Sequence, residues 1–283
     1  MPIDCVITAD TGMEFPEMYR HWDKIDQLLY QERGIRLTIL RHPKGFEWLM
    51  FDEPKERAKT LETRMKAGVP PYGNGWPGIR VRWCTGQLKT HLISKKVNRL
   101  KKENNALHYV GIAADEPARI KNEIYPLVEW GITEAQALQI CYDRGFDWNG
   151  LYGIYHRCSC WCCPFQRIDE LRKLRRHHPE LWEKLREMDE RALGQFGRTA
   201  LGRFKDNWSV ERLEERFAAE DAERKENEMK QDKDQEIRNM LSGVPAKNIV
   251  IAVDDLPPKT LEQGIKEMKA REQKRPKKRG RSR

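Results

Sequence analysis

The residues best suited to chemistry are cysteines that gather in one short stretch. Four of the chain's seven cysteines lie within six residues, at Cys158, Cys160, Cys162 and Cys163. Thiols cluster in this way to bind a metal ion or an iron–sulfur cluster, to form a redox pair, or to build disulfides. No secretory signal opens the chain, so we expect a reducing compartment, where such a cluster indicates metal binding or catalysis.

The spacing within this stretch favours a metal site. Thiolates placed like Cys160 and Cys163, with Cys162 between them, can point at one ion, and Pro164 restrains the backbone of the loop. The missing ligand would come from a distant segment, and Cys84 is the candidate. The alternative interpretation is that these cysteines are small buried hydrophobic residues.

Composition indicates a cytoplasmic protein with a basic tail. The 283 residues are 39% hydrophobic and 34% charged, and no apolar run approaches the roughly 20 residues of a membrane span. The net charge of +9 comes mainly from residues 274–283, because the rest holds 46 basic against 44 acidic residues. We expect this tail to be disordered and able to contact nucleic acid, with a solubilising terminus as the alternative.

The elements that must position these residues begin with a predicted βαβ unit. Residues 3–9 and 35–40 are short apolar runs typical of buried strands, with an amphipathic helix between them. Such crossovers join parallel strands, and ligands of open α/β sheets lie at the carboxyl ends of the strands. The turn Asp10-Thr11-Gly12 follows the first strand and would lie at that edge.

Further along the chain we predict a helix over 87–100, a third strand over 108–113 and a capped helix over 133–145. Residues 73–78 fit the pattern G-x-G-x-x-G, but no strand precedes them, a proline interrupts them and no helix follows. We therefore interpret them as a loop and not as a dinucleotide site.

The change in composition after the cysteine stretch predicts three parts. They are an α/β domain over 1–167 that includes the cysteine loop, a helical extension over 168–257, and the basic tail over 258–283. Within the extension, residues 218–240 are expected to form an exposed helix, and the apolar run 248–253 to add one strand.

Five short segments of this chain recur together in a known family. They are D-T-G-M-E-F-P-E-M-Y at 10–19, R-W-C-T-G-Q-L-K at 82–89, G-I-A-A-D-E at 111–116, Y-P-L at 125–127 and C-W-C-C-P at 160–164. In this order they resemble the phosphoadenosine-phosphosulfate reductase family of the adenine-nucleotide α-hydrolase superfamily. The resemblance covers about residues 1–195 and implies an α/β fold with a parallel-sheet, Rossmann-like core.

The resemblance also implies a substrate, an adenine nucleotide or sulfonucleotide bound near Asp10, Thr11 and Gly12. The anionic groups of such a substrate need cations, and arginine gives bidentate contacts. The candidates that lie beside the motifs are Arg82, Lys89, Arg119 and Arg157. The alternatives are ordinary surface charges and, for Asp10, a carboxylate that complements a helix dipole.

Adenylyl-sulfate reductases of this family hold a [4Fe–4S] cluster with a cysteine pair and a distant C-x-x-C. By resemblance, Cys84 lies where the first pair would be, and Cys160 with Cys163 supplies the second. Either Cys162 or Cys158 must then be the fourth ligand, and we favour Cys162. Four thiolates suit an iron–sulfur cluster or structural zinc equally by softness, and the resemblance favours iron–sulfur.

Two motifs of the family are absent from the sequence. One is the S-G-G-K-D-S loop that cradles nucleotide phosphates, and we hypothesise that the chain begins at an internal methionine downstream of that loop. The other is the C-terminal E-C-G-L-H motif, and no cysteine follows Cys163. Its absence argues against the ordinary reductase mechanism, in which a C-terminal thiolate attacks sulfur.

The sequence thus predicts a family member that performs sulfur reduction or sulfur transfer on an adenine nucleotide beside a metal centre, together with an electron donor. A sulfur-transfer relative of the kind that acts in DNA phosphorothioation would also fit. The alternative from another class is a non-catalytic, metal-stabilised module that associates with nucleic acid and has lost nucleotide binding. A third possibility is an inactive fragment.

Overall fold

The computed structural model describes residues 3–79, 81–158, 160–205 and 208–241. The chain divides into two units, Met1–Ala219 and Glu220–Arg283. The first unit holds every predicted site residue. The predicted strand 248–253 and the tail 258–283 lie outside the described residues.

A parallel βαβ unit opens the fold, as predicted. Strands β1 (Val6–Asp10) and β2 (Leu37–Arg41) pair in parallel, and helix α1 (Pro16–Arg33) connects them. Proline occupies the first turn of α1, where its missing N–H costs nothing. The helix ends at Gly34, which adopts the left-handed conformation that glycine accepts without strain.

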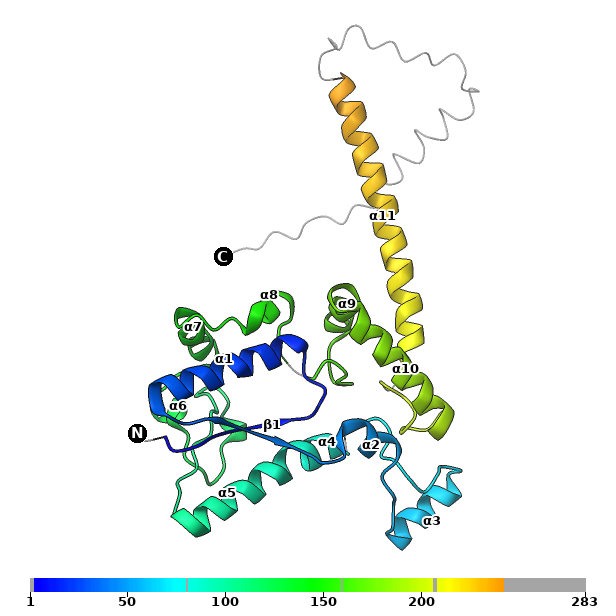
Figure 1. Cartoon of the computed structure of the whole chain (residues 1–283). Coiled ribbons are helices and arrows are strands. Elements are labelled where there is room, and N and C mark those ends of the chain that lie inside the picture. Colours follow the sequence, from blue (N-terminus) through cyan, green and yellow to red (C-terminus); the bar gives the residue numbers. More distant parts are fainter. Residues whose placement is uncertain (1–2, 80, 159, 206–207, 242–283) are drawn as a thin grey trace, which may run out of the picture. The chain divides into compact units, whose positions relative to one another are not determined.

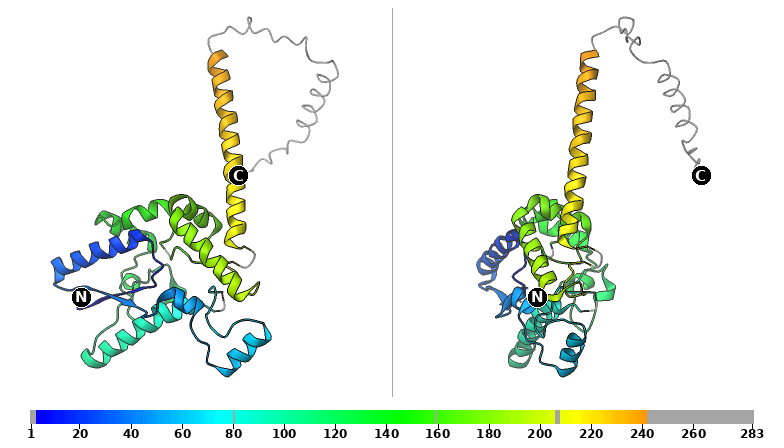
Figure 2. Two further views of the ribbon diagram at one scale, coloured as in Figure 1. Left: turned by 45° about the vertical axis from the view of Figure 1, so that its right-hand side comes forward. Right: turned by 90° about the vertical axis from the view of Figure 1, so that its right-hand side faces the viewer.

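Helices cover both faces of this strand pair. Helix α1 lies on one face and helix α5 (His91–Asn104) on the other (Figures 1 and 2). Helix α4 (Trp83–Thr85) and a π-helical turn, Gly86–Thr90, lead directly into α5. The helix predicted over 87–100 is therefore confirmed, with a π-helical start. Such π-helical turns are frequent at functional sites.

The predicted third strand is wrong. Within the described residues, the segment 108–113 makes only one parallel bridge, between Tyr109 and Ile124. An apolar run becomes a strand only if another strand supplies hydrogen-bonding partners, and this segment meets a loop. The described chain is mostly helical with one small parallel sheet, and the Rossmann-like core implied by the resemblance is not confirmed.

The remaining α-helices follow along the chain. They are α2 (Gly45–Phe51), α3 (Ala58–Lys66), α6 (Pro126–Glu129), α7 (Glu134–Asp143), α8 (Leu151–Ile154), α9 (Ile168–His177), α10 (Pro179–Phe196) and α11 (Val210–Leu241). The capping box at Thr133 is present, with the side chain of Gln136 closing it. The glycine-rich segment 73–78 is a loop, as predicted.

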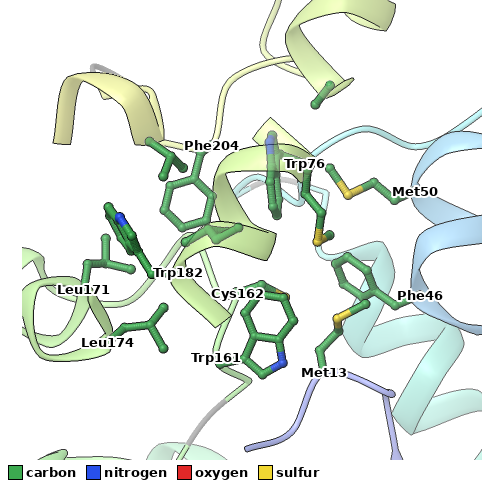
Figure 3. Close-up of a cluster of buried hydrophobic side chains, with 14 of the residues drawn as sticks. Met13, Phe46, Met50, Trp76, Trp161, Cys162, Leu171, Leu174, Trp182 and Phe204 are labelled. Carbon is green, nitrogen blue, oxygen red and sulfur yellow. The ribbon is translucent and has the colours of Figure 1, made fainter. Parts of the chain in front are cut away.

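One hydrophobic core runs through the first unit. Met13 and Phe46 from the N-terminal part pack in the same cluster as Leu171, Trp182 and Phe204 (Figure 3). This core crosses the predicted boundary after residue 167, which stays a prediction from composition. No helix in the described residues is long and apolar enough to cross a membrane.

Candidate thiol site at the carboxyl end of β1

The turn after β1 is built around the carboxylate of Asp10. This side chain is 4% exposed and accepts hydrogen bonds from the backbone N–H of Gly12 at 2.7 Å and the hydroxyl of Tyr19 at 3.0 Å. Its other oxygen pairs with Nε of Arg41 at the end of β2, at 2.7 Å. Asp10 therefore ties both strand ends to α1, and its oxygens are occupied by protein donors.

Four side chains from three distant segments meet beside this turn. The hydroxyl of Thr11 donates to Oε1 of Glu14 at 2.9 Å and lies 3.5 Å from Sγ of Cys160. The Cys160 thiol lies 3.8 Å from the same Glu14 oxygen. Nζ of Lys89, in the π-helical turn, lies 3.5 Å from it as well. We call Thr11, Glu14, Lys89 and Cys160 the thiol cluster.

Backbone hydrogen bonds hold the cysteine loop against the turn. The N–H of Trp161 donates to the carbonyl of Met13 at 3.0 Å, which joins the loop to the segment after β1. The loop closes on itself through the N–H of Cys163 and the carbonyl of Cys160, at 3.1 Å. The side-chain amide of Gln166 donates to the same Cys160 carbonyl at 2.7 Å. The position of Cys160 therefore depends on backbone contacts as well as on its thiol.

The charges in the cluster oppose one another. Burial and, after it, the Glu14 carboxylate raise the pKa of the Cys160 thiol to about 12, although Lys89 and the Thr11 hydroxyl act in the opposite direction. Burial lowers the pKa of Lys89, but the Cys160 and Glu14 charges outweigh it, so its pKa is raised overall. At neutral pH, Cys160 is a protonated thiol beside an ammonium group.

The other predicted metal ligands lie within electrostatic range of this thiol. Cys162 is 1% exposed in the core, and burial followed by the charges of Cys160, Cys163 and Cys84 raises its pKa. Burial also raises the pKa of Cys84, and Cys163 adds to that effect. Thus the four cysteines that we predicted as ligands lie close enough to perturb one another.

The four cysteines have the donor chemistry of a metal site, but their arrangement in the structure does not outline a metal position. Cysteine thiolates are the ligands that zinc or an iron–sulfur cluster takes, and a bound cation would favour the ionised form of these four thiols. By donor type the set fits. Across the part of the chain that the structure describes, no three His, Cys, Asp or Glu side chains are arranged around one metal position. The cysteine side chains are free thiols.

Cys158, the other candidate for the fourth ligand, lies in different surroundings. Burial raises the pKa of its thiol to about 12, and its electrostatic neighbours are Tyr152 and Glu170. None of the four predicted ligands is among them, in contrast to Cys162. Of the two candidates, only Cys162 has other predicted ligands among its electrostatic neighbours.

The predicted cations separate into two groups. Arg82 is exposed and lies over the ring of Phe165 at 4.5 Å, at the edge of the cysteine loop. Arg119 pairs with Glu116 at 2.6 Å, and Arg157 also lowers the pKa of that carboxyl group. Lys89 and Arg82 therefore lie beside the thiols, whereas Arg119 and Arg157 gather around Glu116.

Glu14 was missed in the sequence analysis. Glu14 is buried, with 7% of the residue exposed. Its side chain contacts the other three members of the cluster, so it belongs to the site as much as Cys160 does. A signal was present, because Glu14 lies between Met13 and Phe15, two apolar residues that bury their side chains. Where the fold buries this carboxylate, it needs a charged or hydrogen-bonding partner.

Comparisons with known proteins give one relative and no family. The chain is similar to the uncharacterized protein MJ0066 of Methanocaldococcus jannaschii, with 25% identity over 201 residues. The alignment covers 63% of this chain and 34% of that protein, so the chain spans about a third of its relative. No family model matches the chain, and no solved structure matches it.

Proposed function

We propose that this chain is a member of the phosphoadenosine-phosphosulfate reductase family with a Rossmann-like core. It would bind an adenine nucleotide or sulfonucleotide at the carboxyl end of β1. There it would reduce or transfer sulfur beside a cysteine-ligated metal centre, most consistent with [4Fe–4S] among the thiolate-bound centres.

The observation that carries this proposal is the meeting of three motif segments at one strand end. Residues 10–14, 82–89 and 160–163 are far apart in the sequence, yet Thr11, Lys89 and Cys160 share contacts with Glu14. Segments that merely build a core have no need to join a thiol, an ammonium and a carboxylate at such an edge. Ligands of α/β sheets bind at this edge, which supports a catalytic interpretation.

The chain's own residues can move one proton in this cluster. The Cys160 thiol must lose its proton before it attacks sulfur or binds a metal. Oε1 of Glu14, at 3.8 Å, is the acceptor in reach, and the Lys89 ammonium would stabilise the thiolate left behind. Arg82 and Lys89 supply positive charge for a phosphate or sulfate group.

A metal centre would be held by Cys84, Cys160, Cys162 and Cys163. When bound, it would supply electrons if it is an iron–sulfur cluster, or only rigidity if it is structural zinc. The neighbouring residues Trp161 and Pro164 are buried, and they would exclude water from the loop that holds the metal.

A second function is favoured by the burial of Cys162. This residue lies inside the hydrophobic cluster next to Trp161 (Figure 3), where a structural ligand is more usual than a reacting one. On this alternative the chain is a metal-stabilised, non-catalytic module that associates with nucleic acid.

Metal analysis with an absorption spectrum on anaerobically purified protein tests these two functions. We expect about four irons per chain and a broad visible band. Both should disappear in Cys160→Ser and Cys163→Ser and persist in the matched control Cys141→Ser, whose thiol lies on α7. One zinc per chain would favour the structural module. Absence of any metal, together with undetectable calorimetric binding of adenosine 5′-phosphosulfate, would refute the proposal.

A further inference from the structure

Helix α5 carries a run of positive charge that the proposed function does not use. Residues 86–102 contain six lysine or arginine residues and no acidic residue. Overall composition had indicated a nearly neutral body. The positive charge is therefore concentrated locally in this segment, and the net charge of the whole body does not reveal it.

The helical period places part of this charge on one exposed stripe. Lys95, Arg99 and Lys102 are spaced at i, i+4 and i+7, and all three are exposed. We call these three residues the basic face of α5. They span about 10 Å along the helix axis at 1.5 Å per residue. Figure 1 shows α5 on the outer side of the strand pair.

Ion pairs within the protein leave most of this face uncompensated. Arg99 lies 3.8 Å from Glu103, a distant pair between two exposed side chains. Neither Lys95 nor Lys102 forms an ion pair in the described part of the chain. Like charges at i, i+3 and i, i+4 oppose each other in a helix, so the arrangement does not serve the helix itself. Lys102 alone is explained by the helix dipole, since it lies in the last turn.

The opposite side of the helix decides which partner fits. Ile93, Val97 and Leu100 share the inner face, Val97 is buried, and α5 packs on both strands. A membrane-bound amphipathic helix needs such side chains free to enter lipid, and here they lie on the side that packs on the strands, with Val97 buried. Protein interfaces need an apolar centre and are poor in lysine, and the basic face consists only of cationic side chains.

We propose that the basic face of α5 binds the phosphate backbone of a nucleic-acid duplex. A duplex carries about one negative charge per 1.7 Å of its axis, so about six charges lie opposite three cations along the face. The contacts are to phosphates and thus independent of base sequence. This inference does not depend on the thiol cluster, because none of its three residues belongs to that cluster.

The experiment compares two charge-matched double variants of the full chain. In both, the seven basic residues of 274–283 are changed to glutamine, so that the tail does not hide binding by the helix. One variant adds Lys95→Glu and Lys102→Glu, and the control adds Arg57→Glu and Lys59→Glu at the exposed start of α3. Fluorescence anisotropy measures binding to short labelled DNA and RNA duplexes over a series of salt concentrations.

We expect the α5 variant to bind at least about tenfold more weakly than the tail-changed parent. The slope of log K against log salt should become shallower by about 1.8, since two phosphate contacts are lost. The α3 control should bind like the parent. Circular dichroism and melting show whether each variant folds, and Lys95→Gln with Lys102→Gln gives a milder version of the same loss.

Any of four results would overturn the inference. Equal weakening by both double variants would mean that only net charge matters. Binding that is unchanged in the α5 variant, or already lost in the tail-changed parent, would place any contact with nucleic acid outside α5. Binding to vesicles of anionic phospholipid but not to duplexes would assign the face to membranes.

Discussion

At the scale of single residues, burial decides the state of the titratable groups. His21 shows this away from the thiol cluster. Its imidazole stacks on the indole of Trp148 with ring centroids 5.0 Å apart and meets the ring of Phe146 edge-on. Burial lowers its pKa, Lys24 lowers it further, and Asp147 acts weakly in the opposite direction. The neutral ring is the form that the fold accommodates.

This shift predicts an acid-side loss of stability. The pKa of His21 in the folded state lies below the ordinary value of 6.5, so its contribution to stability is present above pH 6.5 and is lost as pH falls through the folded pKa. In His21→Phe, which keeps an aromatic ring on Trp148, the free energy of unfolding should fall less between pH 7.5 and pH 5. Urea unfolding at both pH values measures it.

His91→Phe provides the control, because His91 is exposed at the start of α5. Its loss of stability on acidification should match that of the parent chain. If His21→Phe also matches the parent, then His21 does not couple protonation to folding.

At the scale of elements, the glycines of the loop 73–78 allow close packing of the backbone. The loop matches the pattern G-x-G-x-x-G but is not a nucleotide-binding fingerprint. Gly75 has φ of 65°, and a Cβ there would lie 2.4 Å from the carbonyl oxygen of Leu201. The indole N–H of Trp83 donates to the Gly75 carbonyl at 3.1 Å. The loop therefore connects α4 to the segment after α10, and only a residue without a side chain allows this approach.

Gly75→Ala should consequently be more costly than an alanine at an open left-handed glycine. Gly131 is the matched comparison, with φ of 66° and no atom near the added Cβ. We expect about 1 kcal/mol for Gly131→Ala from backbone strain alone. Gly75→Ala should cost at least about 2 kcal/mol more, because backbone must move. Equal losses in chemical denaturation would show that the contact with Leu201 is unimportant.

A buried carboxylate organises the start of α11. Asp189 on α10 accepts hydrogen bonds from the indole N–H of Trp76 at 2.9 Å and from the N–H of Val210 at 2.7 Å. Val210 is the first residue of α11, so Asp189 satisfies one of the donors that every helix leaves open. Burial raises the pKa of this carboxyl group, although both hydrogen bonds oppose the shift.

Removal of that carboxylate should destabilise the first unit substantially. Asp189→Ala leaves two buried N–H groups without acceptors, at about 1–3 kcal/mol each. Asp189→Asn still has one oxygen to accept from Trp76, so we expect an intermediate loss. Thermal unfolding followed by circular dichroism ranks the three proteins. An Asn variant that is less stable than the Ala variant would contradict this order.

At the scale of the whole molecule, the core extends beyond the predicted α/β domain. Leu171 and Leu174 on α9 and Phe217 on α11 are buried in the same cluster as Phe15, which follows β1. The compositional change after residue 167 marks the start of amphipathic helices. Those helices bury their apolar faces against the N-terminal part.

Truncated chains can distinguish the predicted boundary after residue 167 from the boundary after Ala219. A chain that ends at residue 219 should keep a cooperative unfolding transition, because the first unit ends at Ala219. A chain that ends at residue 167 should lose the transition and its near-ultraviolet circular dichroism, since α9, α10 and the start of α11 no longer cover the core. Cooperative unfolding of the shorter chain would support the boundary after residue 167.

The sequence predicted well wherever the signal was local. Proline and glycine at the ends of α1, the capping box of α7 and the break at Pro179 between α9 and α10 are all present. Each depends on residues within one or two turns of each other, so the short-range pattern contains the whole cause. The gathering of thiols around Cys160 was equally visible, because four cysteines stand within six residues.

The tertiary structure alone decided what depends on distant partners. The segment 108–113 has the composition of a strand, but a strand forms only where a neighbour offers hydrogen bonds, and that neighbour is a matter of topology. The place of Glu14 beside Lys89 and Cys160 is likewise fixed by how β1, the π-helical turn and the cysteine loop pack. The periodicity of the sequence indicates which face of a helix or strand is apolar. Which other element packs against that face is decided only when the whole chain folds.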